Sequence, residues 1–316
     1  MRLEPRSPTL IGLLKAAAAC TVVFSLTTFA HPWHRYFELF SHFRLQYLVV
    51  ALILALLLAV TRQRHWAAAM AAVSIINALP VVPWYVTDSA TPAANKTQIH
   101  ILFANVNSGN SNTQALIELA EAEQPDLIVL QEVNDRWATA MDARRSDYPH
   151  RRVIPRNDQF GIAVYSRQAF VKVDVLDSPP FGFPSLVIQQ NIGGIVVNLV
   201  STHPIPPPGK QRFEARNEQL ADIGARIAAL DGPTLLIGDL NTAMWGHHYE
   251  MLIDRTGLRN ARRGYGVIPT WPAQLPFAMI PIDHCLVSNE IAVLDIRSGP
   301  AIGSDHLPLI VTLGLL

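Results

Sequence analysis

Charged residues and cysteines are scarce in this sequence. Charged residues make up 16% of its 316 residues, whereas an ordinary soluble domain has about a quarter. Only Cys20 and Cys285 are present, and no cysteine and histidine spacing typical of a zinc site occurs. The scarcity of cysteine argues against a disulfide-rich scaffold, but it leaves the cellular compartment open.

The shortage of charge is concentrated in the N-terminal part of the chain. Residues 1–96 carry eight Lys and Arg and three Asp and Glu, whereas residues 97–316 carry 17 and 22, which is a net charge of −5. Binding to duplex nucleic acid without sequence preference depends on Lys and Arg that neutralise phosphates. The acidic C-terminal part is therefore a poor generic candidate for duplex binding.

Three long apolar runs occupy the N-terminal part, at residues 9–30, 45–60 and 66–86. About 20 apolar residues cross a bilayer as a helix, and the first and third runs meet that length. The second run is shorter but purely aliphatic between Arg44 and Arg62. The sequence therefore predicts three transmembrane helices, with the lipid bilayer as a partner of residues 9–86.

Positively charged residues predict the orientation of these helices. Two arginines precede the first run and two lie in the short loop between the second and third runs. The positive-inside rule then places the N-terminus inside and residues 97–316 outside, which is the periplasm of a bacterium with two membranes. Two alternatives remain open: a buried helical hairpin of a soluble domain, and a signal peptide in residues 1–30 that is cleaved.

The chain divides into a membrane anchor at 1–86, a polar linker at 87–97 and a domain at 98–316. Within the domain, short apolar strands alternate with helices, and no internal sequence repeat is visible. This alternation predicts a layered α/β or α+β fold. Strands are expected near 99–106, 126–131, 160–167, 171–177, 186–191, 193–203, 234–237, 283–288 and 307–315, and helices near 113–123 and 211–230.

Polar residues stand at one end of six predicted strands. Any one of them is explained by a turn, because Asp and Asn favour turns for local hydrogen-bonding reasons. Grouped carboxylates, amides and imidazoles are costly to bury unless a metal or substrate neutralises them. The residues are Asn105 and Asn107, Gln131 and Glu132, Ser201 to His203, Asp239 and Asn241, Asp283 and His284, and Ser304 to His306.

These residue types suit hydrolysis of a phosphoester. Glu132 can bind a hard cation such as Mg²⁺, and Asp239 can orient and deprotonate a water. Asp305 offers a further ligand, while His306 can donate to a phosphate. Asp283 can pair with an imidazole and hold its tautomer and charge. Together they would support in-line attack of water on phosphorus.

The motifs ANVN, LQEV, GIAVYSR, THP, GDLN, IDH and GSDHLPL occur in the order found in the endonuclease/exonuclease/phosphatase superfamily, and residues 97–316 resemble that family. The resemblance implies a four-layer α/β sandwich of two packed, mixed and mostly antiparallel sheets flanked by helices. It also implies a metal-dependent phosphoric ester hydrolase that uses Mg²⁺, with Mn²⁺ as an alternative.

The resemblance implies a role for each site residue. Many nuclease members have Asp where Asn107 stands, so a second metal position would be weaker here. Glu132 matches the principal metal ligand, and Asn107 and Asp305 match metal-side positions. The remaining matches are Asp239 as the residue that positions the nucleophile, Asn241 as its phosphate-binding neighbour, Asn105 beside metal-bound water or phosphate, His203 as a phosphate contact, and Asp283 as the partner of His306.

Several other features have two interpretations. The loops PPFGFP (179–184) and MWGHH (244–248) could contact lipid or line the pocket, or they could simply pack. Two arginine clusters could recognise an anionic substrate or form a solvated surface. They comprise Arg144, Arg145, Arg151, Arg152 and Arg156, and Arg259, Arg262 and Arg263.

The sequence thus predicts a membrane-anchored, Mg²⁺-dependent phosphoesterase whose substrate is nucleic acid, phospholipid or a small phosphodiester. The alternatives are an inactive phosphate- or lipid-binding member of the same fold, and a transporter or scaffold with an accessory domain. No protein partner can be inferred from the sequence.

Overall fold

The computed structural model describes residues 9–86 and 97–316. It divides into two compact units, Met1–Pro83 and Trp84–Leu316. The predicted linker at 87–97 lies outside the described residues except for Thr97. The two units are described separately.

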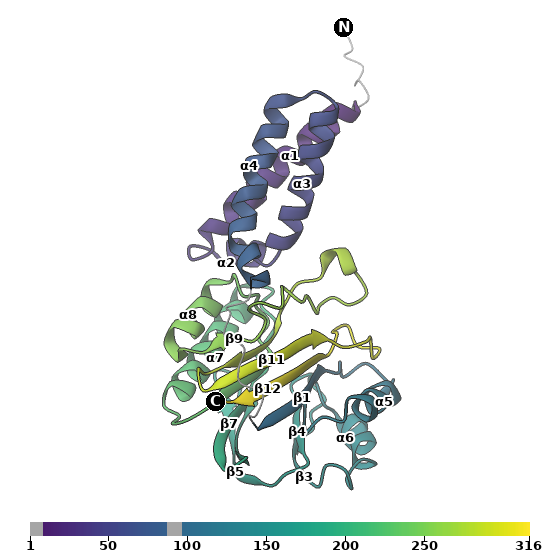
Figure 1. Ribbon diagram of the computed structural model, residues 1–316, viewed down its shortest axis with the longest axis vertical. Coiled ribbons are helices and arrows are strands. Elements are labelled where there is room, and N and C mark those ends of the chain that lie inside the picture. Colours follow the sequence, from purple (N-terminus) through teal and green to yellow (C-terminus); the bar gives the residue numbers. More distant parts are fainter. Residues whose placement is uncertain (1–8, 87–96) are drawn as a thin grey trace. The chain divides into compact units, whose positions relative to one another are not determined.

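The first unit consists of helices. Apart from two 3₁₀ turns at Thr28–Ala30 and Val82–Tyr85, these are α1 (Leu10–Thr27), α2 (Arg35–Ser41), α3 (Arg44–Val60) and α4 (Arg64–Val81). A short turn joins α3 to α4, so these helices form an antiparallel pair, against which α1 packs (Figure 1). Their shared core consists of Ala18, Ala51, Leu54, Leu58, Met70 and Val73.

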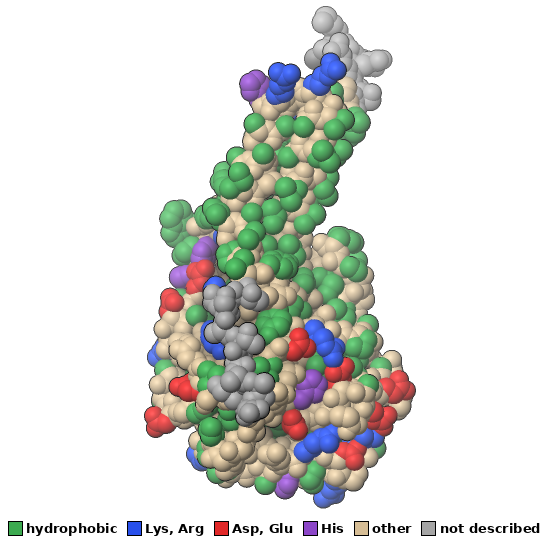
Figure 2. Space-filling model, viewed as in Figure 1, with side chains coloured by type: hydrophobic (Ala, Val, Ile, Leu, Met, Phe, Trp, Pro, Cys, Tyr) green, Lys and Arg blue, Asp and Glu red, His purple; other side chains and the backbone are tan. Residues whose placement is uncertain are grey.

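Two stretches of this unit are long and apolar enough to cross a membrane. They are Leu10–Ala30, with 21 residues, and Arg64–Tyr85, with 22 residues. The helices α2 and α3 would form a third span only as a pair bent by 65°. Figure 2 shows hydrophobic side chains over most of the visible face of these helices. The predicted number of three spans therefore stays a prediction, whereas two candidate spans are present.

The second unit contains two six-stranded sheets (Figure 1). The first has the order β11-β12-β1-β2-β4-β3 and the second β5-β6-β7-β8-β10-β9. The strands of the first sheet are β1 (Gln98–Asn105), β2 (Leu127–Gln131), β3 (His150–Ile154), β4 (Ile162–Ser166), β11 (Ile291–Ser298) and β12 (Leu309–Leu315). Those of the second are β5 (Phe170–Ser178), β6 (Phe183–Ile192), β7 (Ile195–Ser201), β8 (Thr234–Asp239), β9 (Arg259–Asn260) and β10 (Asp283–Val287).

Both sheets are mixed and mostly antiparallel, and they share one topology. In each sheet the third and fourth strands, β1 with β2 and β7 with β8, form the single parallel pair. A helix joins the two strands of each parallel pair, α5 (Thr113–Glu123) in the first sheet and α7 (Lys210–Ala228) in the second. The fold therefore contains an internal repeat that the amino-acid sequence does not show.

The period-two alternation of the strands separates two apolar cores. Along β1, Ile101 and Phe103 face the second sheet and join one cluster with its residues, such as Leu199 and Ile237. Leu102, between them, faces α5 and α6 (Asp135–Asp142) in a second cluster. The other face of the second sheet carries α7 and α8 (His247–Thr256) (Figure 1). The result is the expected four-layer arrangement of two packed sheets with flanking helices.

Three details differ from the expectations. The short helices α6 and α8 form where no helix was expected. Asn134 is the N-cap of α6, and its side chain accepts a hydrogen bond from the backbone nitrogen of Trp137. The loop expected at 179–184 is shorter, because Phe183 already pairs with Ser178 at the start of β6.

Candidate active site

Strand register brings the predicted polar residues to one edge of the two sheets. Asn105 pairs with Gln131 at the carboxyl ends of the parallel strands β1 and β2. In the second sheet, β10 runs antiparallel to β8, and Asp283 pairs with Asp239. Residues that end β1, β2 and β8 and the residue that opens β10 therefore meet, although up to 178 positions separate them along the chain.

Asp239 lies at the centre of the resulting cluster and is only 2% exposed. Its Oδ1 accepts a hydrogen bond of 2.8 Å from the backbone nitrogen of Asn241. Its Oδ2 lies 3.4 Å from Nδ2 of Asn105 and of Asn241. The same oxygen lies 3.4 Å from Nε2 of His203 and 3.7 Å from Nε2 of His306. One carboxylate oxygen is thus surrounded by two amides and two imidazoles that come from both sheets.

Asp283 orients His306. Its Oδ2 lies 2.9 Å from Nδ1 of the imidazole, and both side chains are buried. Burial lowers the pKa of His306, but the charge and hydrogen bond of Asp283 outweigh it. Asp239 and Asp305 act in the same direction, and the pKa is raised to about 10. The Asp283 carboxylate therefore favours the cationic form of the imidazole.

The imidazole of His203 is buried without a hydrogen bond. The residue is 3% exposed, and neither of its ring nitrogens forms a hydrogen bond with any residue in the described part of the chain. Its Nε2 lies 3.4 Å from Asp239 Oδ2 without the geometry of a hydrogen bond. Leaving a buried polar group unpaired costs about 1–3 kcal/mol. An unpaired imidazole in this position is a candidate for binding a ligand oxygen.

The remaining predicted residues extend the cluster beyond Asn105. Glu132 Oε1 accepts a hydrogen bond of 3.1 Å from Asn105 Nδ2, and its Oε2 accepts one of 3.1 Å from the backbone nitrogen of Ser108. Asn107 donates through Nδ2 to Asp305 Oδ1 at 2.6 Å, and its backbone nitrogen donates to Asn105 Oδ1 at 3.1 Å. All nine predicted residues are thus linked in one network by contacts of 3.7 Å or less.

Three of these residues adopt a positive φ, namely Asn107 (55°), Glu132 (61°) and Asn241 (50°). Residues other than glycine rarely adopt this conformation, and each instance costs on the order of 1–3 kcal/mol. Backbone strain at three positions of one cluster is typical of sites whose side chains must point in a fixed direction.

The oxygen-rich side of the cluster fits a hard divalent cation. Nδ2 of Asn105 lies 3.1 Å from Glu132 Oε1 and 3.4 Å from Asp239 Oδ2, so these two carboxylate oxygens are at most 6.5 Å apart. Two carboxylates so close repel each other, and a bound cation would relieve the repulsion. Oxygen ligands and few carboxylates are what Mg²⁺ prefers.

A second set of groups is close enough to hold a metal, with ligand atoms of Asp239, Asp283 and His306 within 4.8 Å of one another. However, Asp283 Oδ2 lies 2.9 Å from His306 Nδ1, and an imidazole that carries a proton on both nitrogens has no lone pair to offer a metal. The donors nearer Glu132, including those of Asn107 and Asp305, are all oxygens and are therefore the better candidates for a hard cation.

Gln131 joins the two sheets beneath the cluster, and Gly238 allows their close approach there. Gln131 is fully buried, accepts a hydrogen bond of 2.8 Å from the backbone nitrogen of Asp239 and donates one of 2.8 Å to the carbonyl of Thr202. A Cβ atom on Gly238 would lie 2.3 Å from that carbonyl and 2.6 Å from Gln131 Nε2. Sequence reasoning noted Gln131 only as a polar strand end and missed this bridging role.

Two buried arginines support the cluster from behind. Arg216, on α7, donates at 3.1 Å to the carbonyl of Asn241, and Arg262 donates to the carbonyl of Asp283. Burial lowers the pKa of Arg262 to about 10. Arg262 is fully buried, so the expectation that it forms an exposed basic cluster with Arg259 and Arg263 is wrong.

The other arginine cluster is partly neutralised by acidic neighbours. Arg151 pairs with Asp142 at 3.1 Å. Arg156 donates from Nε to Asp158 at 2.9 Å. Arg145 and Arg152 of this cluster are exposed, so both interpretations of the cluster stay open.

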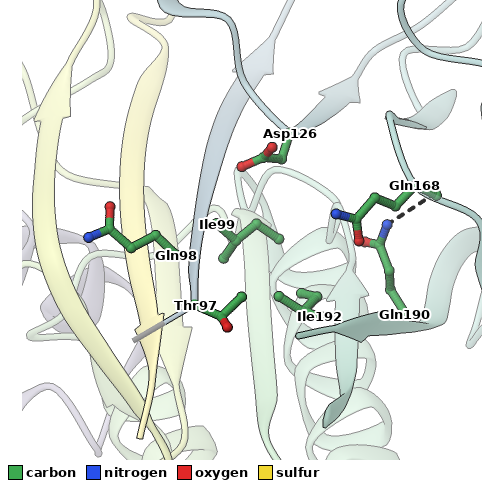
Figure 3. A pocket seen from close by; sticks show the side chains of 7 residues that line it. All are labelled: Thr97, Gln98, Ile99, Asp126, Gln168, Gln190 and Ile192. Carbon is green, nitrogen blue, oxygen red and sulfur yellow. Dashed lines mark hydrogen bonds between the residues drawn. The ribbon is translucent and has the colours of Figure 1, made fainter. Parts of the chain in front are cut away.

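A small pocket lies at the opposite end of β1 from the cluster. Figure 3 shows its side chains, which include Gln98, Asp126 and Gln190. Asp126 accepts a hydrogen bond of 2.8 Å from the backbone nitrogen of His100, and Gln190 donates to the carbonyl of Gln168. Because β1 places Gln98 and Asn105 at its two ends, this pocket is separate from the candidate active site.

Solved structures with the same fold include several hydrolases. An endonuclease/exonuclease/phosphatase from Bacteroides vulgatus superposes with a TM-score of 0.59 at 17% identity, over 70% of this chain and 100% of that chain. An AP endonuclease from Archaeoglobus fulgidus gives 0.57 at 19% identity, over 67% and 98%. Sphingomyelinase C from Streptomyces griseocarneus gives 0.51 at 19% identity, over 72% and 100%. These identities are low, so the likeness shows the fold alone.

A comparison of the sequence with curated proteins finds no match. A model of the endonuclease/exonuclease/phosphatase family matches residues 102–306, which include every residue of the polar cluster. Members of this family are hydrolases that act on phosphoester bonds. The chain therefore belongs to the endonuclease/exonuclease/phosphatase family.

Proposed function

We propose that this protein is a membrane-anchored, Mg²⁺-dependent phosphoesterase that hydrolyses phosphodiester bonds by in-line attack of water. The observation that carries the proposal is the position of Asp239. Its Oδ2 faces His203, His306 and Asn105. The same side-chain nitrogen of Asn105 also donates a hydrogen bond to Glu132.

Each side chain has a role in the proposed reaction. Asp239 orients a water and takes its proton, since Asn241 fixes the carboxylate through its other oxygen. His203, which has no hydrogen-bond partner within residues 97–316, donates to an oxygen of the phosphoryl group. His306, kept cationic by Asp283, stabilises the negative charge that develops on that group.

Glu132 would hold the metal, with Asn107 and Asp305 on the same side. A bound Mg²⁺ would supply neutralisation of charge on the phosphoryl oxygens. The water oxygen bonds to phosphorus as the bond to the leaving oxygen breaks, and the leaving oxygen takes up a proton from solvent to become an alcohol, while Asp239 releases to solvent the proton that it took from the water. The inactive alternative, a phosphate- or lipid-binding member of the fold, is supported only by Asn107 in place of Asp.

The test is turnover of bis(4-nitrophenyl) phosphate by the full chain, with Mg²⁺ and with EDTA. We expect Mg²⁺-dependent release of nitrophenolate, reduced by about 10³-fold or more in Asp239→Asn. Asp254→Asn, at an exposed site on α8, is the matched control and should keep full activity. Absence of turnover on a panel of nucleic acids, phospholipids and nucleotides as well would favour the inactive alternative.

We also propose that α3 spans the membrane together with α1 and α4. The outer face of α3 is apolar, with Leu52, Ile53 and Leu56 each more than half exposed, as lipid contact requires. Three spans put the N-terminus and the catalytic domain on opposite sides, whereas two would put them on the same side. A reporter active only in the periplasm, fused after residue 97, should therefore give signal, and signal from a cytoplasm-only reporter would contradict three spans with the N-terminus inside.

A further inference from the structure

Three segments without any charged residue adjoin residues of the candidate active site. They are SPPFGF at 178–183, which includes the last residue of β5 and the first of β6, PIPPPG at 204–209, which leads into α7, and PAQLPFAMI at 272–280. We refer to these three loops as the apolar rim. Their most exposed large side chains are Phe181 (54%), Leu275 (48%) and Phe277 (78%).

The first two loops border the His203 side of the cluster. The rings of Phe160 and Phe183 stack with centroids 3.6 Å apart, and Phe160 lies 5.4 Å from the His203 ring. Ile205 packs with Phe160 in a small apolar cluster separate from the two main cores. Phe181 lies 5.6 Å from Phe183 and extends this apolar surface into solvent.

The third loop lies near His306. Trp271 donates from Nε1 to Asp305 Oδ2 at 3.0 Å, and its ring lies 6.4 Å from the His306 ring. The backbone nitrogen of Ala273 donates to the Asp305 carbonyl at 2.8 Å. These contacts attach the base of the loop to the cluster, while Leu275 and Phe277 at its tip are exposed.

From this arrangement we propose that the apolar rim docks on a lipid bilayer and presents the active site to the phosphodiester headgroup of a phospholipid. Exposed apolar side chains gathered around a polar site are typical of membrane-binding surfaces, and aromatic residues favour the interface of a bilayer. The assignment of phospholipid as substrate rests on the proposed hydrolytic function, whereas docking on the bilayer is independent of it.

Charge distinguishes a bilayer from nucleic acid as the occupant. Proteins that bind single strands combine stacking aromatics with a positively charged groove, and the apolar rim supplies aromatics but no Lys or Arg. Lys210, which follows the second loop, lies 3.8 Å from Glu214. Arg156, the arginine beside Phe183, is paired with Asp158. The chain itself also carries two candidate membrane spans, so a bilayer would be available to the domain.

Docking can be measured without any turnover. The full chain with Cys20→Ser would be reconstituted into phosphatidylcholine vesicles, with a fluorophore on Phe277→Cys, because Cys285 is buried and should not react. Val171→Cys is the matched control, because Val171 is exposed and lies far from the rim along β5. It precedes Ser178 by seven strand residues, which span about 23 Å. Lipids with a quencher on the acyl chain should quench the label at 277 several-fold more than the label at 171.

Equal quenching at the two positions would overturn docking, even if the enzyme hydrolyses a soluble diester. If a single-stranded oligonucleotide changes the fluorescence of the label at 277 and lipid does not quench it, nucleic acid is the favoured occupant and docking on a bilayer is also overturned.

The substrate has its own test. The double variant Phe181→Ser with Phe277→Ser should lower hydrolysis of vesicle phosphatidylcholine by about tenfold or more. Turnover of bis(4-nitrophenyl) phosphate, which needs no bilayer, should stay unchanged in the same variant.

If that variant hydrolyses vesicles as fast as the parent chain, the rim does not deliver lipid substrate. If the parent chain hydrolyses the soluble diester but no vesicle phospholipid, the proposed substrate class is wrong while the proposed function survives. Loss of all turnover with lipid quenching retained would contradict the proposed function and leave docking intact.

Discussion

Oδ2 of Asp283 and Nδ1 of His306 are 2.9 Å apart, in a pair that is almost completely closed to solvent. The two residues come from different sheets, since Asp283 opens β10 of the second sheet and His306 precedes β12 of the first. The hydrogen bond therefore forms only when the two sheets have packed. This relationship couples the proposed chemistry to the sandwich architecture.

Asp283→Asn should impair catalysis about as much as loss of the imidazole itself. The substitution removes the charge that favours the cationic form of His306 and replaces the carboxylate with a neutral, weaker acceptor for Nδ1. We expect kcat on a soluble diester to fall by about 10²–10⁴-fold in Asp283→Asn and in His306→Ala. The double variant should lose little more than either single one, because the two residues act as a unit.

The control for this pair is Asp295→Asn, whose carboxylate is half exposed on β11. It should leave kcat unchanged. Additive losses in the double variant would show that Asp283 and His306 act independently and would contradict the proposed coupling.

Gly238→Ala should destabilise the domain, although alanine is small and the position lies in a regular strand. The added Cβ would come within 2.3 Å of the Thr202 carbonyl, so strands β7 and β8 or Gln131 would have to move. Overpacking of this kind costs about 1–3 kcal/mol, which corresponds to a fall in the melting temperature of several degrees for a domain of this size.

Thermal unfolding of the full chain in detergent checks this expectation. Gly314→Ala is the control, because its Cβ would meet Leu294 only at an ordinary distance of 3.4 Å. Equal melting temperatures for the two variants would show that the sheets have room at Gly238.

The order of the motifs was sufficient to predict the sandwich and its polar edge. Asp239 and Asn241 follow an apolar strand directly, so their position at a strand end is a local property of the sequence. The role of Gln131 is not local, because its partners are 71 and 108 residues away. The burial of Arg262 is not a local property either. Nothing in the sequence around Arg259, Arg262 and Arg263 indicates that Arg262 is buried against β10. The metal and catalytic roles of the nine residues remain predictions.

An ion pair between α5 and β11 makes stability depend on pH. Arg297 donates to Glu123 Oε2 at 2.6 Å, and this hydrogen bond lowers the pKa of the Glu123 carboxyl. A folded-state pKa below the unfolded value, about 4.3, gives stability that is present above that pH and lost as the pH falls through the folded value.

Arg297→Gln should therefore destabilise the protein at pH 7 by no more than about 1 kcal/mol, the usual range for a surface pair. The difference from the parent chain should shrink as the pH is lowered below about 4. Unfolding measured at pH 7 and pH 3.5 checks the sign, with the exposed Arg145→Gln as control. A difference that grows on acidification would contradict the assigned partner.

Metal binding should stabilise the fold through Glu132. Glu132 and Asp239 both approach Asn105 Nδ2, so a cation held by Glu132 would lower the repulsion between the two carboxylates in the folded state. A ligand that binds only the folded state at 100 times its dissociation constant adds about 2.7 kcal/mol. We expect a higher melting temperature in MgCl₂ than in EDTA, and we expect this increase to be absent in Glu132→Gln. Glu118→Gln, on the exposed face of α5, should keep the full increase, and a Mg²⁺ effect that survives Glu132→Gln would place the metal elsewhere.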